Sequence, residues 1–229
     1  MLRVRLFLPG ICYCNKNIIY LLHFKSKKMK GSSAHAIERR IVAWKRGKIF
    51  FPSDFADIAS DGSVRITLMR LCREGMIVRL ASGIYYYPEI DTEDGLGTLK
   101  PGPMKIAKAV AKHDKISIIP SGPYAPNALG LSTQVAGNAY FITNGAPRKI
   151  KLSDSMSIVF THSSRAKDFA YKSEVMQLIV AAIKEAGEGK LHDDEKTVIK
   201  EHLSKVPKTE FEHDIKLAPI WVRNTISEL

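Results

Sequence analysis

The sequence contains few cysteines and none in a pattern that holds a structural metal. Only three of its 229 residues are cysteine: Cys12, Cys14 and Cys72. Cys12 and Cys14 lie one residue apart, and no second pair completes a four-ligand zinc site. Cys72 falls on the inner face of a predicted helix, where it packs as a small apolar group. This usage fits a reducing cytosol, so we expect a cytoplasmic protein.

The first 30 residues also lack features of a membrane segment. They hold seven Lys and Arg and no acidic residue, and a short apolar run follows Arg3 and Arg5. That start resembles a signal peptide, but Pro9 and Gly10 interrupt the apolar run and no small-residue cleavage site follows. A second apolar run, residues 18–24, is too short to cross a bilayer. We expect residues 1–30 to be a leader outside the folded domains, with Met29 as the natural start and no membrane partner. The alternative is a basic membrane-surface or signal-like leader.

Catalytic motifs are missing as well. There is no lysine-containing phosphate loop, no dinucleotide glycine fingerprint and no G-x-S-x-G turn. Glu188 and Lys190, with Asp154 upstream, match a nuclease spacing only loosely. His192, Asp193 and Asp194 form a local cluster, but helix capping explains the aspartates better than a metal does, and Ser121 is better explained as a helix cap than as a nucleophile. The sequence therefore predicts no enzyme, no cofactor and no metal.

Charge is unevenly distributed along the chain. Net charge is +12, of which residues 1–30 supply +7, residues 31–103 supply +1 and residues 104–229 supply +4. The body is only mildly basic, so charge alone supports nucleic-acid binding weakly. Within residues 38–88, however, nine basic residues stand against five acids. We expect a DNA-binding domain at 33–90, a Gly-, Pro- and acid-rich linker at 91–103, and a second domain at 104–229.

Residues 52–88 carry the most informative pattern in the chain. Pro52 begins a short helix, a second helix covers residues 63–74 with Asp61 or Ser63 as its cap, and Gly75 ends it. Two β-rich runs, 76–80 and 84–88, then flank the short loop 81–83 and predict a hairpin. An amphipathic helix over 33–46 precedes them and packs across both. This order is typical of a winged helix-turn-helix.

The second helix of this unit divides into two faces at 100° per residue. Val64, Leu68, Leu71 and Cys72 face inward, and the opposite face carries three arginines and no acid. Arginine pairs with guanine and apolar groups meet the thymine methyl in the major groove, although a solvated surface helix would look similar. Arg79 and Ser82 lie at or near the hairpin tip, where a wing reaches phosphate. The candidate DNA-binding residues are Ser63, Arg65, Ile66, Met69, Arg70, Arg73, Arg79 and Ser82.

The rest of the chain predicts an α+β fold with a smaller sheet and a helical C-terminus. Strands are expected at 116–119, 140–143, 148–152 and 156–161. Helices are expected at 104–113, 123–130, from 170 to 187, at 193–203 and at 210–217.

Several segments of this sequence resemble a known family of regulators. These are residues 51–55, 71–80, 81–85, 99–103, 119–122 and 128–132, and the run RLASGIYYYP at 79–88 is the most specific. From about residue 37 to 221, some four fifths of the chain, the sequence resembles the AbiEi-type antitoxins of type IV abortive-infection toxin–antitoxin pairs.

The resemblance implies a transcriptional regulator that binds double-stranded operator DNA, represses its own operon and counters a nucleotidyltransferase toxin. Two alternatives remain: a metal-dependent nuclease that the N-terminal module targets, and an orphan regulator without a toxin. No sequence feature marks a dimer seam, so the oligomeric state stays open.

Overall fold

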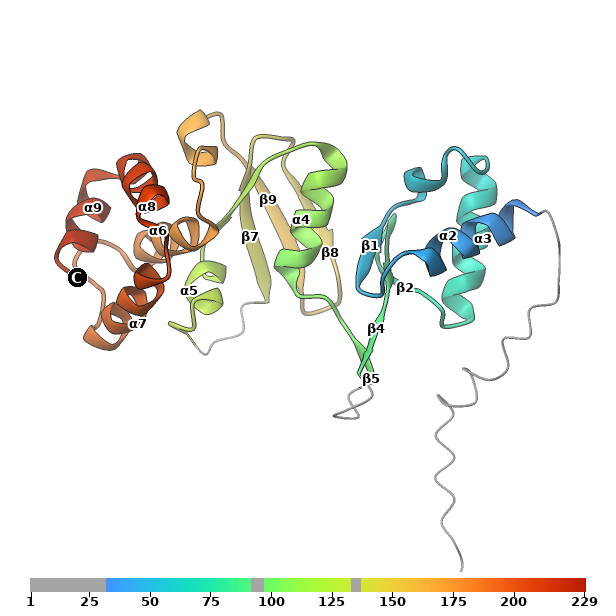
Figure 1. The fold of residues 1–229 in the computed structure, drawn as a ribbon, viewed down its shortest axis with the longest axis horizontal. Coiled ribbons are helices and arrows are strands. Elements are labelled where there is room, and N and C mark those ends of the chain that lie inside the picture. The colour runs from blue at the N-terminus through green and yellow to red at the C-terminus, as the bar shows by residue number, and fades with distance from the viewer. Residues whose placement is uncertain (1–31, 92–96, 133–136) are drawn as a thin grey trace, which may run out of the picture.

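The protein is described by a computed structural model, which covers residues 32–91, 97–132 and 137–229. The predicted leader, with Cys12, Cys14 and Met29, lies outside the described residues. The fold is a mixed α+β arrangement, with an N-terminal helix–strand region, a central sheet and a helical C-terminus (Figure 1). Within the described ranges, no helix is both long enough and apolar enough to cross a membrane.

The N-terminal lobe comprises three helical segments and a three-stranded sheet. Its strands follow the order β1-β3-β2, and both pairings are antiparallel. The hairpin expected from the sequence is β2–β3, whereas β1 was not expected. The elements are α2 (Ser33–Ala43), β1 (Lys48–Phe50), η1 (Pro52–Phe55), α3 (Asp61–Arg73), β2 (Val78–Ala81) and β3 (Ile84–Tyr87).

Helix α3 begins two residues earlier than its sequence predicts and ends as expected. Ser60 precedes the first helical residue, so the prediction of a cap at Asp61 or Ser63 is wrong. Both of those residues lie inside the first turn. At the other end Gly75 has a φ of +73°, and the Met76 N–H donates to the Leu71 carbonyl over 3.1 Å. Glycine reaches this left-handed conformation without the steric cost that a side chain would add.

Aromatic side chains and the inner faces of α2 and α3 form the core of this lobe. Ile37 and Ile41 of α2, Leu68 of α3, and Phe55 are fully buried. Trp44 packs its ring against Phe50 and Phe55, with centroids 5.2 and 5.4 Å apart. Trp44 is therefore a core residue, as its spacing with the isoleucines suggests.

The segment expected to be a linker contains regular structure. β4 (Glu89–Asp91) and β5 (Gly97–Leu99) pair as an antiparallel ribbon, which projects from the body in Figure 1. The predicted linker at 91–103 thus includes strand β5, and its role as a connector between domains stays a prediction.

A mixed four-stranded sheet and helix α4 form the middle of the molecule. The strand order is β6-β7-β9-β8, with β7 and β9 parallel and the other two pairings antiparallel. β8 is therefore an edge strand. The elements are α4 (Pro103–Asp114), β6 (Ile118–Ser121), α5 (Tyr124–Ala128), β7 (Asn138–Thr143), β8 (Arg148–Lys151) and β9 (Ser157–His162).

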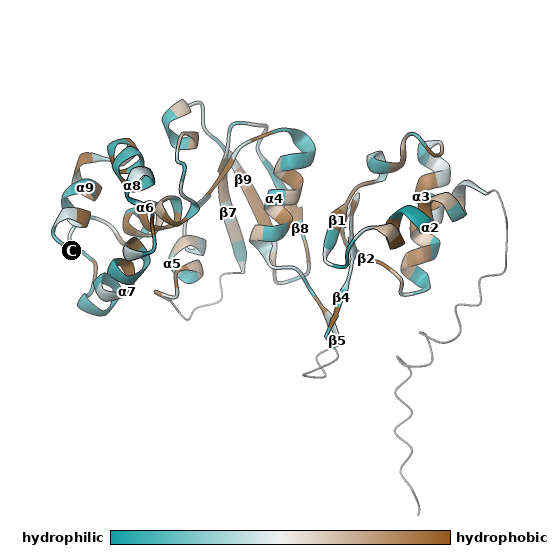
Figure 2. Ribbon diagram, in the orientation of Figure 1, coloured by the Kyte–Doolittle hydropathy of each residue, from teal (hydrophilic) through white to brown (hydrophobic). Residues whose placement is uncertain are grey.

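A second core joins the N-terminal lobe to this sheet. Ile84 and Tyr86 of β3 pack in one cluster with Val110 of α4 and with Phe141 and Phe160 of the central strands. Figure 2 shows the apolar colour along β9 and on one side of α4. The two parts of the molecule thus share a buried apolar contact.

The C-terminal region is helical, as the sequence predicts, with one α-helix and one short 3-10 helix more. Its longest helix, α6, buries Met176, Ile179, Val180, Ala182 and Ile183, and α9 was not expected. The elements are η2 (Ala166–Phe169), α6 (Glu174–Ala186), α7 (Asp193–Ser204), α8 (Lys208–Asp214), η3 (Ile215–Leu217) and α9 (Ile220–Ser227).

A buried carboxylate holds the start of α6 in place. Asp214 has no exposed side-chain surface. It accepts hydrogen bonds from the backbone N–H groups of Lys172 and Ser173, at 2.9 and 2.8 Å, and contacts His213 Nδ1 at 2.8 Å. Burial pushes the pKa of Asp214 up, but these hydrogen bonds outweigh it, and the pKa lies below its ordinary value.

Candidate nucleic-acid interface

The outer face of α3 presents large apolar side chains to solvent. Val64, Leu68 and Leu71 face the core, which directs Ile66 and Met69 outward. Ile66 is 70% exposed and Met69 51% exposed. The sequence predicted this division of the helix, which leaves the outer face of α3 available for contact with a ligand.

Arginines accompany these apolar residues, but the expectation of an acid-free face is wrong. Arg65 Nε lies 2.9 Å from Asp61 Oδ2, one turn earlier. Arg70 lies 3.1 Å from Glu74, the residue that follows α3, and 3.9 Å from Glu38 of α2. The face therefore carries positive charge that is partly neutralised at its edges.

Arg73 differs from the other two arginines. Its Nη2 donates to the sulfur of Met69 at 3.5 Å. Among the residues that the structure describes, no carboxylate lies within ion-pair distance of its guanidinium. Arg73 is thus the α3 arginine that can reach a ligand without releasing a carboxylate.

Ser63 and the two hairpin residues occupy different surroundings. Ser63 is exposed in the first turn of α3, where its carbonyl accepts a hydrogen bond from the Thr67 hydroxyl at 2.9 Å. Arg79 is exposed on β2, and Ser82 is exposed in the β2–β3 turn. The pairing register slips between Arg79 and Ala81, a local irregularity that bends an edge strand. The structure thus places the first seven candidate residues on α3 and β2, and Ser82 in the turn.

Contacts from α2 fix the approach to α3. Arg40 donates twice to the Asp57 carboxylate, at 2.7 Å each, and once to the Asp54 carbonyl. The Arg40 hydrogen bond is the main reason that the pKa of Asp57 lies below its ordinary value. Arg40 is therefore engaged in a bidentate pair with Asp57.

Cys72 lies on the inner side of α3, as predicted. It packs against the core of the N-terminal lobe. Burial raises the pKa of the Cys72 thiol, and the charge of Arg79 opposes that effect. The thiol is therefore a packing group and a poor nucleophile.

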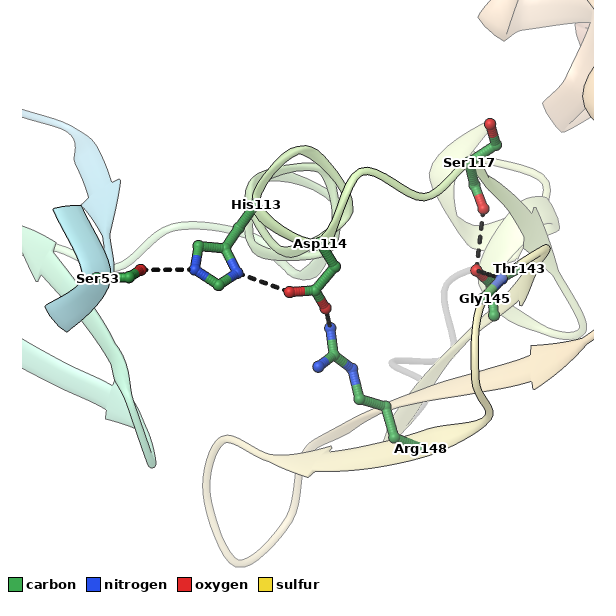
Figure 3. A network of polar contacts seen from close by, with 7 residues as sticks. All are labelled: Ser53, His113, Asp114, Ser117, Thr143, Gly145 and Arg148. Carbon is green, nitrogen blue, oxygen red and sulfur yellow. Dashed lines mark hydrogen bonds and ion pairs between the residues drawn. The ribbon is translucent and has the colours of Figure 1, made fainter.

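A polar network connects the N-terminal lobe to α4 and β8 (Figure 3). Ser53 Oγ lies 2.8 Å from His113 Nε2, and His113 Nδ1 lies 2.6 Å from Asp114 Oδ1. The other oxygen of Asp114 accepts from Arg148 of β8. The Phe51 ring stacks on His113, with centroids 3.9 Å apart. Sequence analysis missed this network because its members lie as many as 95 positions apart and form no motif.

The candidate catalytic residues of the sequence lie apart from this network. Glu188 and Lys190 are exposed, and Asp154 pairs with Lys151 at 2.8 Å. Asp193 and Asp194 occupy the first turn of α7, where Glu195 closes the cap by accepting from the His192 N–H. In the described ranges, no three His, Cys, Asp or Glu side chains gather closely enough to hold a metal.

Ser121 is not the helix cap that we expected. It is the last residue of β6, and Pro123 precedes the first residue of α5. Among the described contacts of α5, no side-chain cap is present. The proline at the turn starts this short helix by fixing φ instead.

Comparison with known proteins places the chain in a family. No curated protein matches the sequence. Among solved structures, the crystal structure of the RV2827C protein from Mycobacterium tuberculosis is a distant match, with 11% identity and a TM-score of 0.38 over 86% of this chain and 80% of that chain. A family of unknown function, DUF6088, matches residues 36–211. That match covers more than half of the sequence, and the chain therefore belongs to the DUF6088 family.

Proposed function

We propose that the N-terminal lobe is a winged helix-turn-helix and that the protein is a sequence-specific DNA-binding transcriptional regulator. In this assignment η1 and α3 form the helix-turn-helix, α3 is the recognition helix, and the β2–β3 hairpin is the wing. The strand β1 pairs with β3 and anchors the wing to the lobe.

The exposed face of α3 is the observation that carries this proposal. Ile66 and Met69 stand in solvent between Arg65, Arg70 and Arg73. An apolar side chain on a recognition helix contacts the thymine methyl, and an arginine pairs with the O6 and N7 atoms of guanine. One face therefore offers both kinds of base contact within three helical turns.

The framework behind α3 supports the same assignment. Recognition requires a helix held rigidly at a fixed angle, because a shift of about 1 Å weakens a designed contact severely. The Arg40–Asp57 pair ties the segment before α3 to α2, and buried Leu68 and Leu71 fix the helix itself. Arg79 and Ser82 on the hairpin would then meet the phosphate backbone.

The antitoxin role is the finer part of the proposal. It is supported by the AbiEi-type resemblance of the sequence, which runs from the N-terminal lobe through the central sheet into α9. The partners would be double-stranded operator DNA and a cognate nucleotidyltransferase toxin. A nucleotidyltransferase gene beside this one, whose toxicity this protein relieves, is the expected result. Normal growth with the neighbouring gene expressed alone would leave an orphan regulator.

Retention of promoter DNA tests the DNA-binding part. The full chain should shift the DNA upstream of its own gene in a mobility-shift assay, in the presence of competitor DNA. Binding should weaken as salt rises, because phosphate contacts release counterions. Absence of specific retention would refute the proposal. Cleavage of that DNA in Mg²⁺, lost in Glu188→Gln, would identify the nuclease instead.

The α3 arginines provide a graded test of the recognition face. Arg73→Ala should cost roughly 1–3 kcal/mol of operator affinity, as expected for an arginine that contacts a base. Arg70→Ala should also fall within roughly 1–3 kcal/mol but near the lower end, since Arg70 must first leave Glu74. Lys200→Ala is the matched control, because Lys200 is exposed on α7. Equal affinities for Arg73→Ala and the control would contradict the assigned face.

A further inference from the structure

A cleft of about 320 Å³ lies between the N-terminal lobe and the central sheet. One wall is Phe51 and the β2–β3 turn, including Ser82 and Gly83. The other wall is the end of α4, with His113 and Asp114, and the edge strand β8. Ligand pockets occur preferentially between structural units, and about 300 Å³ is the lower end of their usual size.

His113, Asp114 and Arg148 of the cleft lining are joined by polar contacts, which Figure 3 shows. His113 is engaged on both ring nitrogens, by Ser53 and by Asp114. Asp114 in turn accepts from Arg148 through its second oxygen. These contacts hold His113 and Asp114 in fixed positions.

Arg148 is the member of this group whose N–H donors are only partly used. A guanidinium carries five N–H donors in a rigid plane. In the described part of the chain, the only acceptor for them is Asp114, which the Nη2 atom reaches. The guanidinium carbon also lies 5.5 Å from the Phe160 ring centroid, a contact that orients the group. The remaining donors suit a bidentate anion such as a phosphate.

Part of the cleft lining is apolar. Val110, Ile84 and Ile150 line it together with the Phe51 ring. Val110 is 1% exposed and Ile84 is 5% exposed, so this surface belongs to the shared core and is rigid. A ligand that fits this lining has an anionic group and a compact apolar or aromatic body.

We propose that this cleft binds a small phosphate monoester, with Arg148 holding the phosphate and the apolar lining, including Phe51, holding the organic part. The β2–β3 turn with Ser82 forms part of one wall, so an occupied cleft restricts the position of this turn. The ligand then alters operator affinity, because the turn belongs to the hairpin assigned to DNA contact. This regulatory step rests on the proposed DNA-binding function, whereas ligand binding itself does not.

Three probes separate the two halves of the site. Phenyl phosphate carries both features, inorganic phosphate carries only the anion, and benzyl alcohol carries only the ring. Calorimetric titration of the full chain at constant ionic strength should give saturable binding of phenyl phosphate. Inorganic phosphate should bind at least 10-fold more weakly, and benzyl alcohol more weakly still. Equal binding of phenyl phosphate and inorganic phosphate, or no saturation, overturns the proposal.

Two variants locate the binding. Arg148→Gln should weaken phenyl phosphate at least 10-fold, while Lys200→Ala on α7 should leave it unchanged. Because Arg148→Gln also removes a partner of Asp114, Ser82→Tyr provides a second test: it fills the cleft from the exposed turn without removing a charge. Unchanged binding in both variants would place the ligand elsewhere and overturn the assignment.

Operator binding with and without phenyl phosphate then tests the regulation. A change of at least 3-fold in operator affinity, absent in Arg148→Gln, is the expected result. Loss of operator affinity in Arg148→Gln without any binding of phenyl phosphate would show that the phosphate belongs to DNA, and would refute the small-molecule site. Phenyl phosphate binding by a chain that retains no promoter DNA would refute the proposed function and leave the site standing.

Discussion

Helices α3 and α6 have the same length of 13 residues and opposite relations to solvent. α6 buries five apolar residues, and the Ser173 side chain caps its first turn by accepting from the Met176 N–H. α3 buries Val64, Leu68 and Leu71 but leaves Ile66 and Met69 in solvent. Its first turn has no side-chain cap among the described contacts.

This difference separates a helix that holds the fold together from one whose outer face is available for binding. Packing on several sides leaves α6 little surface for a partner. One face of α3 packs against the core, and the opposite face presents apolar and cationic side chains to solvent. Changes near α6 should therefore alter stability, and changes on the outer face of α3 should alter binding.

The largest expected effect is on the α6 side, at Asp214. Asp214→Ala would leave the buried N–H groups of Lys172 and Ser173 without their acceptor. We expect a loss of about 4 kcal/mol in the free energy of unfolding, measured by urea denaturation. A loss below 1 kcal/mol would show that the carboxylate does not anchor α6.

The pH dependence of stability checks the same anchor. The folded-state pKa of Asp214 lies below its ordinary value, so its contribution is present above that value and disappears as the pH falls through the folded pKa. In Asp214→Asn, the free energy of unfolding should therefore decrease less as the pH falls than it does in the wild-type chain.

A pair of substitutions on α3 tests the division of its two faces. Leu68→Ala removes a fully buried side chain and should cost about 3 kcal/mol of stability. Ile66→Ala alters an exposed side chain and should change stability by no more than about 0.5 kcal/mol. Operator affinity should nevertheless fall about 5-fold in Ile66→Ala, if each thymine contact is worth about 1 kcal/mol. Equal losses of stability in the two variants would contradict the assignment of Leu68 to a buried face and Ile66 to an exposed face.

The smallest effect concerns Tyr171, beside α6. Burial, followed by the charges of Asp168 and Asp214, raises the pKa of Tyr171 to about 12. Its contribution to stability is therefore complete below the unfolded pKa of about 10 and is lost as the pH rises through about 12. Tyr171→Phe should reduce the loss of stability between those pH values, as followed by urea denaturation. Ultraviolet titration should show one late-ionising tyrosine fewer.

Local patterns in the sequence predicted most elements correctly. Val64, Leu68 and Leu71 recur at helical spacing, which predicted α3 and its two faces. Glycine and short apolar runs predicted the β2–β3 hairpin and strands β7 to β9. These features depend on neighbouring residues only, so periodicity and turn chemistry suffice to find them.

Features that depend on distant residues could not be found this way. β1 is only three residues long, and its strand conformation comes from pairing with β3. The acids that pair with the α3 arginines lie at helix ends or, for Glu38, on another helix. The network of Ser53, His113, Asp114 and Arg148 exists only because α4 and β8 fold against the N-terminal lobe. Tertiary contact, rather than local preference, decides each of these.

Strand β3 joins two cores through its alternating side chains. Tyr85 and Tyr87 pack with α2 and α3, whereas Ile84 and Tyr86 pack with α4 and the central strands. When heat or denaturant opens one core, it therefore exposes one face of β3, whose opposite face completes the other core. The two should melt as a single cooperative unit, and a fragment ending after β3 would leave Ile84 and Tyr86 uncovered and prone to aggregate.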